Sequence, residues 1–528
     1  MEQLEVVLLL LAVVAAVTLL AQKIGVPYPI LMVVAGLGVG LVPFLPRFEL
    51  EPEVVLALFL PPILFSASFF LSPRDLWRNV RPISLLAVGL VFTTTLAVAA
   101  VALAVAPQLG WPAAIALGAI VSPPDAIAAT AIARRLNLPR RLVLIFEGES
   151  LVNDATALTI YRLAVAAVVG TGAFTIGGAA VSFMTVAVGG AVVGLVVGWV
   201  AAWLLSLLDD PPVEVLLSLL VPFAAYLPSE ALGLSGVLAT VAAGLLVGLR
   251  TQRVMSSDTR LLGTSTWKMV IFVVNGFAFL LIGYQLPTVV GDLDGYAVGE
   301  LIGIAAAVSL TVIVVRLVWV YPATYLPRML FPSIARRDPA PPARLPLILG
   351  WGGMRGAVSL AAALALPPEF PGRGLIVFLT FVVILVTLIG QGLTLPLLIR
   401  RLGVVDDGAT EHEEIHARTV AAEAALVRLE ELRGEVPGHL PLIDQLRERY
   451  EHRGEHLVHE HRDEPAPADP DELTPEEVEE MEHDEIRRAV ILAERLAVHA
   501  LRDRGEISDD ALRRVERDLD LDELRREA

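Results

Sequence analysis

Long apolar stretches constrain the fold of this chain more than any other feature of its sequence. Thirteen runs of about 17 to 30 mostly apolar residues are separated by short segments that contain Pro, Gly or charged residues. A helix needs about 20 mostly apolar residues to cross a lipid bilayer. The sequence therefore predicts an all-α membrane protein with thirteen transmembrane helices. The predicted helices are residues 5–22, 28–45, 52–71, 82–106, 111–133, 142–168, 177–206, 213–229, 233–249, 268–288, 300–325, 345–367 and 374–399.

The basic residues between these runs indicate how the helices are oriented. Eighteen Lys and Arg residues occur in alternate connecting segments and just after the last run, whereas the other connecting segments hold only Arg47 and Arg373. Because cytoplasmic loops carry the excess of Lys and Arg, we expect a multi-pass protein of the inner (plasma) membrane. Its N-terminus is predicted outside and its C-terminus in the cytoplasm. The first run lacks a preceding basic segment and a small-residue cleavage site, so we interpret it as a membrane helix.

The last part of the chain has a different composition. Residues 403–528 contain 37 acidic residues, 17 Arg and no Lys, together with all nine histidines. We therefore predict a transmembrane domain at residues 1–402 and a cytoplasmic, acidic, His-containing helical tail at 403–528. Histidines titrate near neutral pH, so this tail could regulate the protein as a pH sensor. A solvated acidic helix bundle without a sensing role is the favoured interpretation.

Thirteen helices can be divided into two units of six with one helix between them. Such a division places the two units in opposite orientation, as in transporters built from inverted repeats. The fifth helix of each unit is interrupted, by Ser122-Pro123-Pro124-Asp125 in the first and by residues 350–353, Gly-Trp-Gly-Gly, in the second. We therefore expect two inverted six-helix repeats in which helices five and twelve are broken.

Asp125 lies at the first of these breaks. Pro123 and Pro124 remove two backbone donors and leave carbonyl groups that need water, a cation or another partner. The helix segment that starts at Ala126 directs its positive N-terminal end to the same place. We predict that Asp125 belongs to a cation site. The alternative is a proline kink at which Asp125 only caps the next helix.

The following helix presents several oxygen atoms on one face. Ser150, Asn153 and Asp154 stand at positions i, i+3 and i+4, and Glu147 lies one turn before them. Hydroxyl, amide and carboxylate oxygens suit hard cations such as Na+. A carboxylate in an apolar wall can hold a proton or a cation, but not readily both, so Asp154 is predicted to exchange the two. The alternative is a hydrogen-bonded cluster that joins helices.

Glu149 requires a permanent partner of opposite charge. It is turned about 100° from Ser150 on the helix, and an unpaired carboxylate is costly in an apolar environment. Two arginines lie within the predicted helices of the second half, Arg316 and Arg355. Arginine keeps its charge and forms bidentate pairs with carboxylates. We predict a structural ion pair between Glu149 and Arg316, with Arg355 compensating helix ends or sharing Glu149, and the choice between the two arginines stays open.

These motifs resemble those of a known transporter family. The segments SPPDAIAATAI, FEGESLVNDATAL and GGMRGAVSLAAALALP are similar to the cation–proton antiporter-1 family, the NhaP-type and eukaryotic sodium–proton exchangers. The resemblance covers about residues 1–400 and implies thirteen helices, crossed broken helices five and twelve, a homodimer and elevator-like alternating access. It also implies that Asp154 is the ion-exchanging carboxylate, Asp125 an essential acid, Ser150 a ligand, and Asn153 the neutral neighbour found in electroneutral exchangers.

The sequence departs from the family pattern at two places. Many members carry an acid in span three, after a Leu-Pro-Pro-x-x-Phe motif, where this chain has Ser66. A threonine that often precedes the acid of the fifth helix is Pro124 here. Ser66 can still donate an oxygen to a cation, so it is included among the predicted ligands, but the preference between Na+, Li+ and K+ is open.

The sequence therefore predicts a secondary antiporter that exchanges H+ for Na+, Li+ or K+ in pH homeostasis, and not an enzyme. The alternatives are a K+-selective antiporter, a cation channel and an organic-anion symporter. The chain has no cysteine for a disulfide or thiolate metal site and no GxxxxGK[ST] phosphate loop for an ATP-driven pump. We expect contact with membrane lipid, and no cofactor, no metal beyond the transported cation and no nucleic-acid partner.

Overall fold

The structure, a computed structural model, is entirely helical in the residues that it describes. The chain divides into two units, residues 1–408 and 409–528, which are described separately. The described residues are 2–24, 27–42, 52–169, 176–254, 257–291, 297–404, 406, 424–434, 440–459 and 504.

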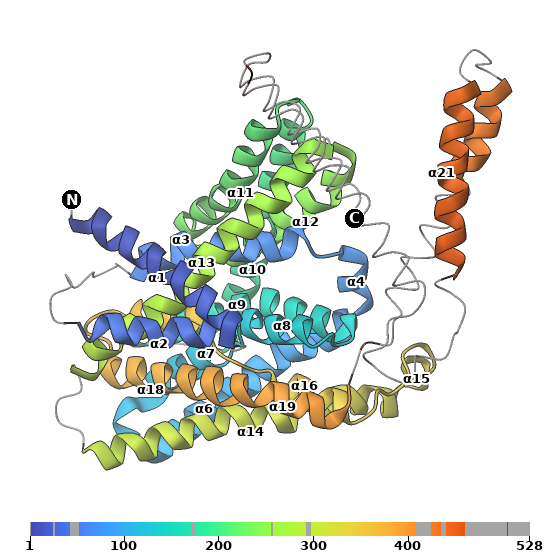
Figure 1. Cartoon of the computed structure of the whole chain (residues 1–528). Coiled ribbons are helices and arrows are strands. Elements are labelled where there is room, and N and C mark those ends of the chain that lie inside the picture. Colours follow the sequence, from blue (N-terminus) through green and yellow to red (C-terminus); the bar gives the residue numbers. More distant parts are fainter. Residues whose placement is uncertain are drawn as a thin grey trace. The chain divides into compact units, whose positions relative to one another are not determined.

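Each predicted membrane span overlaps helical structure in the described part of the first unit (Figure 1). Eight helical stretches among the described residues are long and apolar enough to cross a membrane, and four further apolar helices are shorter. The chain is thus a multi-pass membrane protein, and the total of thirteen crossings stays a prediction. The helices are α1 (Glu2–Ile24), α2 (Tyr28–Gly40), α3 (Pro52–Phe69), α4 (Pro73–Arg78), α5 (Val80–Ser84), the π-helical η1 (Leu85–Leu90), α6 (Val91–Val105), the 3-10 helix η2 (Pro107–Leu109), α7 (Gly110–Val121), α8 (Ala126–Arg135), α9 (Arg140–Val169), α10 (Ile176–Leu205), α11 (Pro211–Ala231), α12 (Gly236–Val254), α13 (Ser257–Gly291), α14 (Val298–Leu330), α15 (Pro332–Arg337), α16 (Arg344–Trp351), α17 (Ala357–Leu364), α18 (Arg373–Leu385), the π-helical η3 (Val386–Gln391) and α19 (Gly392–Leu402).

The helices of the first unit pack mainly in two groups. In one group α13 lies along α2, and α12 packs against α10 and α3. In the other group α7 packs against α6 and α9, and α14 packs against α6 and α16. Small residues permit the closest crossing, because a Cβ atom on Gly36 of α2 or on Gly283 of α13 would overlap the backbone of the other helix. The groups meet where α3 and α13 contact α9, α17 and α18.

Both interruptions predicted from the sequence are present. The first separates α7 from α8 at residues 122–125, and the second separates α16 from α17 at residues 352–356. In a bilayer such backbone occurs only where other protein groups or a water-filled cavity satisfy it. The partners of these segments therefore define the place where a site can form.

The second unit contains a helical pair. Residues 424–434 form one helix and α21 (Leu440–His459) forms the next. Arg447 of α21 lies 3.4 Å from Glu430, and Arg433 lies 3.5 Å from Asp444, so ion pairs link the two helices. Residues 460–503 of the predicted helical tail and the side chains of the tail histidines lie outside the described residues, so the idea of a pH sensor stays a prediction.

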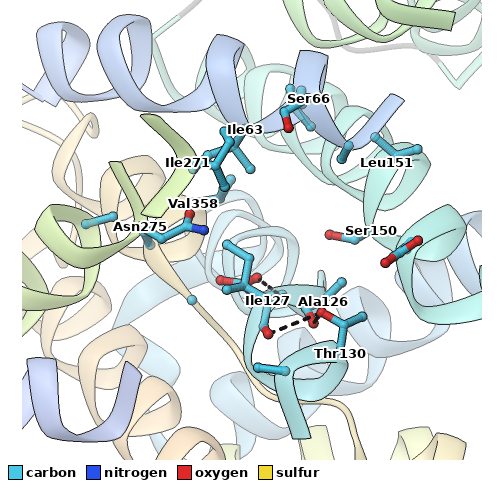
Figure 2. Close-up of a pocket in the computed structure, with 18 of the residues that line it drawn as sticks. Ile63, Ser66, Ala126, Ile127, Thr130, Ser150, Leu151, Ile271, Asn275 and Val358 are labelled. Atoms are coloured by element: carbon cyan, nitrogen blue, oxygen red, sulfur yellow. Dashed lines mark hydrogen bonds between the residues drawn. The ribbon is translucent and has the colours of Figure 1, made fainter. Parts of the chain in front are cut away.

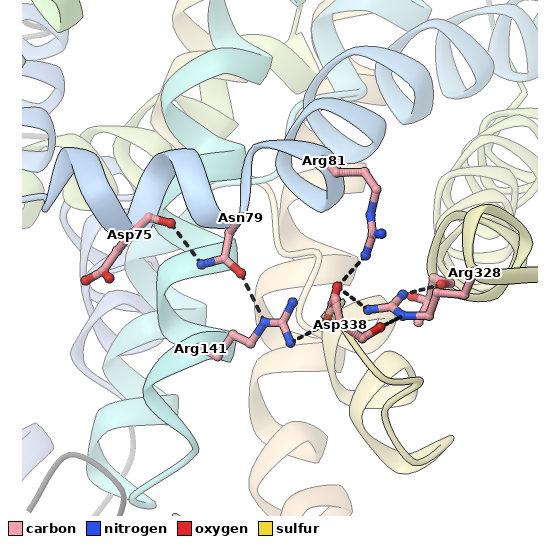
Figure 3. A network of polar contacts seen from close by, with 7 residues as sticks. Asp75, Asn79, Arg81, Arg141, Arg328 and Asp338 are labelled. Atoms are coloured by element: carbon pink, nitrogen blue, oxygen red, sulfur yellow. Dashed lines mark hydrogen bonds and ion pairs between the residues drawn. The ribbon is translucent and has the colours of Figure 1, made fainter. Parts of the chain in front are cut away.

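One carboxylate connects the ends of three helices in the first unit. Asp338, in the turn before α16, accepts hydrogen bonds from Arg81, from Arg141 at 2.9 Å and from Arg328 at 2.7 Å. Arg141 also donates to Oδ1 of Asn79 at 3.0 Å (Figure 3). Burial acts to raise the pKa of Asp338, but the hydrogen bonds and charges of Arg141 and Arg328 outweigh it and lower the pKa to about 2.

This geometry predicts that Asp338→Asn lowers the unfolding temperature by the same amount at about pH 5 and about pH 8. The folded-state pKa lies below the unfolded value, so the stabilisation is complete above about pH 4 and is lost only as the pH falls through about 2. Thermal unfolding of the purified protein at both pH values tests this. Asp75→Asn, which breaks one pair with the exposed Arg140, is the control. A deficit that appears only at the higher pH would contradict the low pKa of Asp338.

Candidate cation-binding site

The two helix breaks contact each other directly. α7 ends where Pro123 and Pro124 cannot donate backbone hydrogen bonds, and α8 begins directly after Asp125. The backbone N–H of Asp125 donates to the carbonyl of Met354 in the second break, with a distance of 2.7 Å. Oδ1 of Asp125 accepts a hydrogen bond from the N–H of Ile127 at 2.8 Å. Asp125 therefore caps α8 and, at the same time, lies at the crossing of the two breaks.

Two side chains satisfy the carbonyl groups that the first break exposes. Nε of Arg355 donates to the carbonyl of Val121 at 3.0 Å, and Nη2 lies 3.4 Å from that of Ser122. Nδ2 of Asn153 donates to the carbonyl of Pro124 at 3.1 Å. Arg355 and Asn153 are both buried. Arg355 thus compensates a helix end, one of the two roles considered from the sequence, and Asn153 fixes the broken segment to α9.

Glu149 and Arg316 form a buried bidentate pair. Nη1 and Nη2 of Arg316 donate to the two carboxylate oxygens of Glu149 at 2.5 and 2.9 Å, and Nη2 also donates to the carbonyl of Leu349. The two side chains are 0% and 1% exposed. Of the two arginines left open by the sequence, the structure places Arg316 against Glu149. The charges cancel, so the pair leaves no net charge inside the protein.

A cavity of about 600 Å³ brings four of the predicted ligands together. Asp125 lies on its wall beside α8, Ser150 and Asp154 come from α9, and Ser66 comes from α3 (Figure 2). Glu147 lines the same cavity one turn before Ser150 and pairs with the exposed Arg134. The i, i+3, i+7 spacing of the three α9 residues explains why they share this wall. The groups on the cavity wall therefore include the two carboxylates and two hydroxyl groups predicted as ligands, which suit a small cation.

The structure does not bring Asn153 to this cavity. The residue is 0% exposed and is absent from the cavity wall, because its position on α9 turns it toward the broken segment. Its amide nitrogen donates a hydrogen bond to the carbonyl of Pro124, as described above. The amide nitrogen therefore has a positioning role, whereas Oδ1 of Asn153 has no partner among the described residues and the expectation that it binds the ion stays a prediction. Glu149, Arg316 and Arg355 also lie outside the cavity wall.

Sequence reasoning missed several polar residues of the cavity, among them Asn275 of α13 and Tyr28 of α2. The predicted site was based on ionisable side chains within the spans and on polar residues near them. The carboxamide of Asn275 inside the apolar run 268–288 could have indicated a site residue, as an ionisable side chain does. A polar group within a membrane helix also needs a partner.

Close packing fixes the carboxylate of Asp125. Gly356, in the second break, lies so near that a Cβ atom at this position would overlap Oδ2 of Asp125. Glycine at residue 356 therefore allows the two breaks to cross with the carboxylate at the cavity.

The chain is similar to known proteins over most of its length. The family described as "Sodium/hydrogen exchanger, transmembrane" matches residues 8–401. An uncharacterised Na+/H+ exchanger of Mycobacterium tuberculosis is 35% identical over 534 residues, which cover 99% of this chain and 96% of that protein. A sodium, potassium, lithium and rubidium/H+ antiporter of Bacillus pumilus is 34% identical over 416 residues, or 75% of this chain and 61% of the relative.

The fold has a counterpart among solved structures. The sodium proton antiporter MjNhaP1 from Methanocaldococcus jannaschii superposes with a TM-score of 0.57 at 19% identity, over 75% of this chain and 98% of that one. At this identity the likeness concerns the fold alone. The family match over most of the chain and the similarity to relatives along its length show that this protein belongs to the sodium/hydrogen exchanger family, a family of secondary transporters and not of enzymes.

Proposed function

We propose that this protein exchanges H+ for Na+, or for Li+ or K+, across the plasma membrane, with Asp154 binding the proton and the cation in alternation. The observation that carries this proposal is the cavity that joins Asp154 to Asp125 at the crossing of the broken helices. Asp154 is 6% exposed, and an ionisable group in the membrane part of a protein is usually functional. The role of the exchange is pH homeostasis.

The ligands divide into charged and neutral groups. Asp154 and Asp125 supply carboxylate oxygens, and Ser150 and Ser66 supply hydroxyl oxygens. A cation that binds displaces the proton of Asp154, and the returning proton displaces the cation, because both compete for one carboxylate. Asn153 beside Asp154 is neutral, so a single exchangeable carboxylate trades one proton for one monovalent cation. The proposed exchange is therefore electroneutral.

Alternating access is the proposed transport mechanism. The cavity is lined by both helix groups, by α2, α3 and α13 on one side and by α8, α9 and α17 on the other. Toward the opposite end of α9, Arg162 pairs with Glu230 and donates to the carbonyl of Leu234, which links α9 to the turn before α12. These features support a state in which the cavity is open toward one end of the helices, while the contacts of Arg162 close the protein at the other end.

The wider architecture is proposed on the same grounds. It consists of thirteen crossings in two inverted repeats at residues 1–402, an external N-terminus, a homodimer and a cytoplasmic regulatory tail at 403–528. The overlap of all predicted spans with helical structure and the asymmetric distribution of Lys and Arg support the crossings and the orientation.

The position of the buried arginines disfavours an organic-anion symporter. Such a protein needs a basic group near the crossing of the breaks, but Arg316 and Arg355 are engaged by Glu149 and by backbone carbonyls and do not line the cavity. The basic residues that do line it, Arg134 and Lys268, are exposed, and Arg134 pairs with Glu147. A K+-selective antiporter remains the second candidate, since the name of the Bacillus relative includes potassium.

Proton exchange in proteoliposomes tests the proposed function. Vesicles with a preset pH gradient should lose it when Na+, Li+ or K+ is added, and the order of the three cations gives the selectivity. Electroneutral exchange predicts the same rate with and without a membrane voltage clamped by an ionophore. Cation flux that follows the voltage without counterflow of protons would instead indicate a channel.

Substitution of Gly356 should impair exchange through Asp125. In Gly356→Ala the added methyl group displaces the Asp125 carboxylate, and we expect a loss of at least about tenfold in exchange rate, because small displacements of a reacting group have effects of this size. The control is Gly303→Ala on α14, where a Cβ atom meets open space. Equal rates in the two variants would show that the position of Asp125 does not matter.

A further inference from the structure

Asn275 is a polar side chain of the cavity to which the mechanism above gives no role. Asn275 lies on α13, within an otherwise apolar stretch, and is 4% exposed while lining the cavity. Figure 2 shows it on the far side of the cavity from Ser150. Its Oδ1 has no hydrogen-bond partner among the residues that the structure describes. Buried polar atoms are normally paired, so an unpaired one at a cavity calls for a ligand.

Tyr28 lies near this amide. Its side chain also lines the cavity, close enough to Asn275 for the carboxamide to act on the phenol group. Tyr28 lies near enough to Asp125 for the charge of the carboxylate to act on the phenol group. The carboxamide thus lies on the α2 and α13 side of the cavity that Asp125 and Asp154 also line.

The carboxamide oxygen of Asn275 is the atom that needs a partner, and a cation in the adjoining cavity can supply one. Carboxamide oxygens are ligands that hard cations accept in proteins.

We propose that Asn275 is a neutral oxygen ligand of the transported cation and that it sets the affinity of the site. This inference rests on the proposed exchange function. The α3 wall supplies only the hydroxyl group of Ser66, so a further oxygen on α13 completes the coordination from that side. Because an amide does not titrate, it strengthens cation binding without adding a second exchangeable proton.

The location of Asn275 also gives it a part in cation release. The amide belongs to the helix group of α2, α3 and α13, whereas Asp125 and Asp154 belong to the other group. A relative movement of the two groups withdraws the amide from the cation. The cation is then held by the carboxylate side alone, which favours its replacement by a proton.

The test compares Asn275→Ala with a matched buried amide. Gln391→Ala is the control, because Gln391 is 2% exposed, its amide atoms have no partner among the described residues, and it does not line the cavity. We expect Asn275→Ala to raise the KM for Na+ about tenfold with a nearly unchanged maximal rate, as for loss of one bond to a charged group. Thermal stabilisation of the purified protein by Na+ should require correspondingly more Na+. Gln391→Ala should change neither quantity.

Asn275→Asp supplies a second variant of nearly the same size. It adds a carboxylate that protons can occupy, so the KM for Na+ should rise more steeply as the pH falls than it does in the unmodified protein. This pH dependence would not follow from a purely structural role of Asn275. An unchanged pH dependence together with an unchanged KM in Asn275→Ala would overturn the proposal.

The KM for Na+ in vesicles and the thermal stabilisation by Na+ together distinguish a failure of this inference from a failure of the proposed function. Asp154-dependent exchange with the same KM in Asn275→Ala and Gln391→Ala overturns the ligand role and leaves the exchange function in place. Stabilisation by Na+ that is lost in Asn275→Ala supports the ligand role even where vesicles show no proton exchange.

Discussion

Asp154→Asn is expected to reduce cation-driven proton flux to the background of protein-free vesicles. The substitution keeps the shape of the side chain but removes the only group of the site that is proposed to carry the exchanged proton. Asp154 is buried at the cavity and has no ion-pair partner among the described residues. A neutral side chain at this place does not strand an opposite charge, so the unfolding temperature should not fall.

The measurement is the collapse of a pH gradient on addition of Na+, Li+ or K+, with unfolding temperature and size-exclusion profile as tests of folding. Asp209→Asn is the matched control, since it makes the same chemical change at an exposed carboxylate away from the cavity. A folded Asp154→Asn protein that still couples cations to protons would refute the assignment of Asp154.

The parts of the fold that depend on local sequence were predictable. Residues Ser122 to Asp125 were predicted to interrupt a helix, because two prolines remove two backbone donors and Asp125 can cap a new helix, and the structure is interrupted there. The proline pair alone does not decide this, since Pro61 and Pro62 lie inside α3. The spacing of Ser150 and Asp154 on one helix placed both on a common face, and both line the cavity. Such features follow from the geometry of a single helix.

Other parts depend on how helices are rotated against one another, which the local sequence does not specify. The choice of Arg316 over Arg355 as partner of Glu149 is one example, and the use of Asn153 to hold Pro124 is another. The π-helical turn Val386–Gln391 was not expected either. It accompanies the position of Thr387, whose hydroxyl group accepts a hydrogen bond from the backbone N–H of Arg355 at 3.1 Å.

Glu149→Ala is expected to destabilise the protein strongly. The guanidinium group of Arg316 is fully buried, and Glu149 supplies two of its hydrogen bonds and all of the charge compensation seen in the pair. Removal of one partner from a buried pair costs about 3–5 kcal/mol, because the remaining charge stays without compensation. We therefore expect low yield and a clear fall in unfolding temperature, measured by thermal denaturation in detergent.

Two further variants separate a stranded charge from a general packing defect. Glu147→Ala breaks the pair with Arg134, whose side chain is 70% exposed, so its cost should be at most about 1 kcal/mol. The double variant Glu149→Leu/Arg316→Met removes both buried charges and fills their space, and should recover much of the lost stability because an apolar pair avoids the desolvation of two ions. If the double variant were less stable than Glu149→Ala, the hydrogen bond from Arg316 to Leu349, and not the charge of Glu149, would be the main contribution of this cluster.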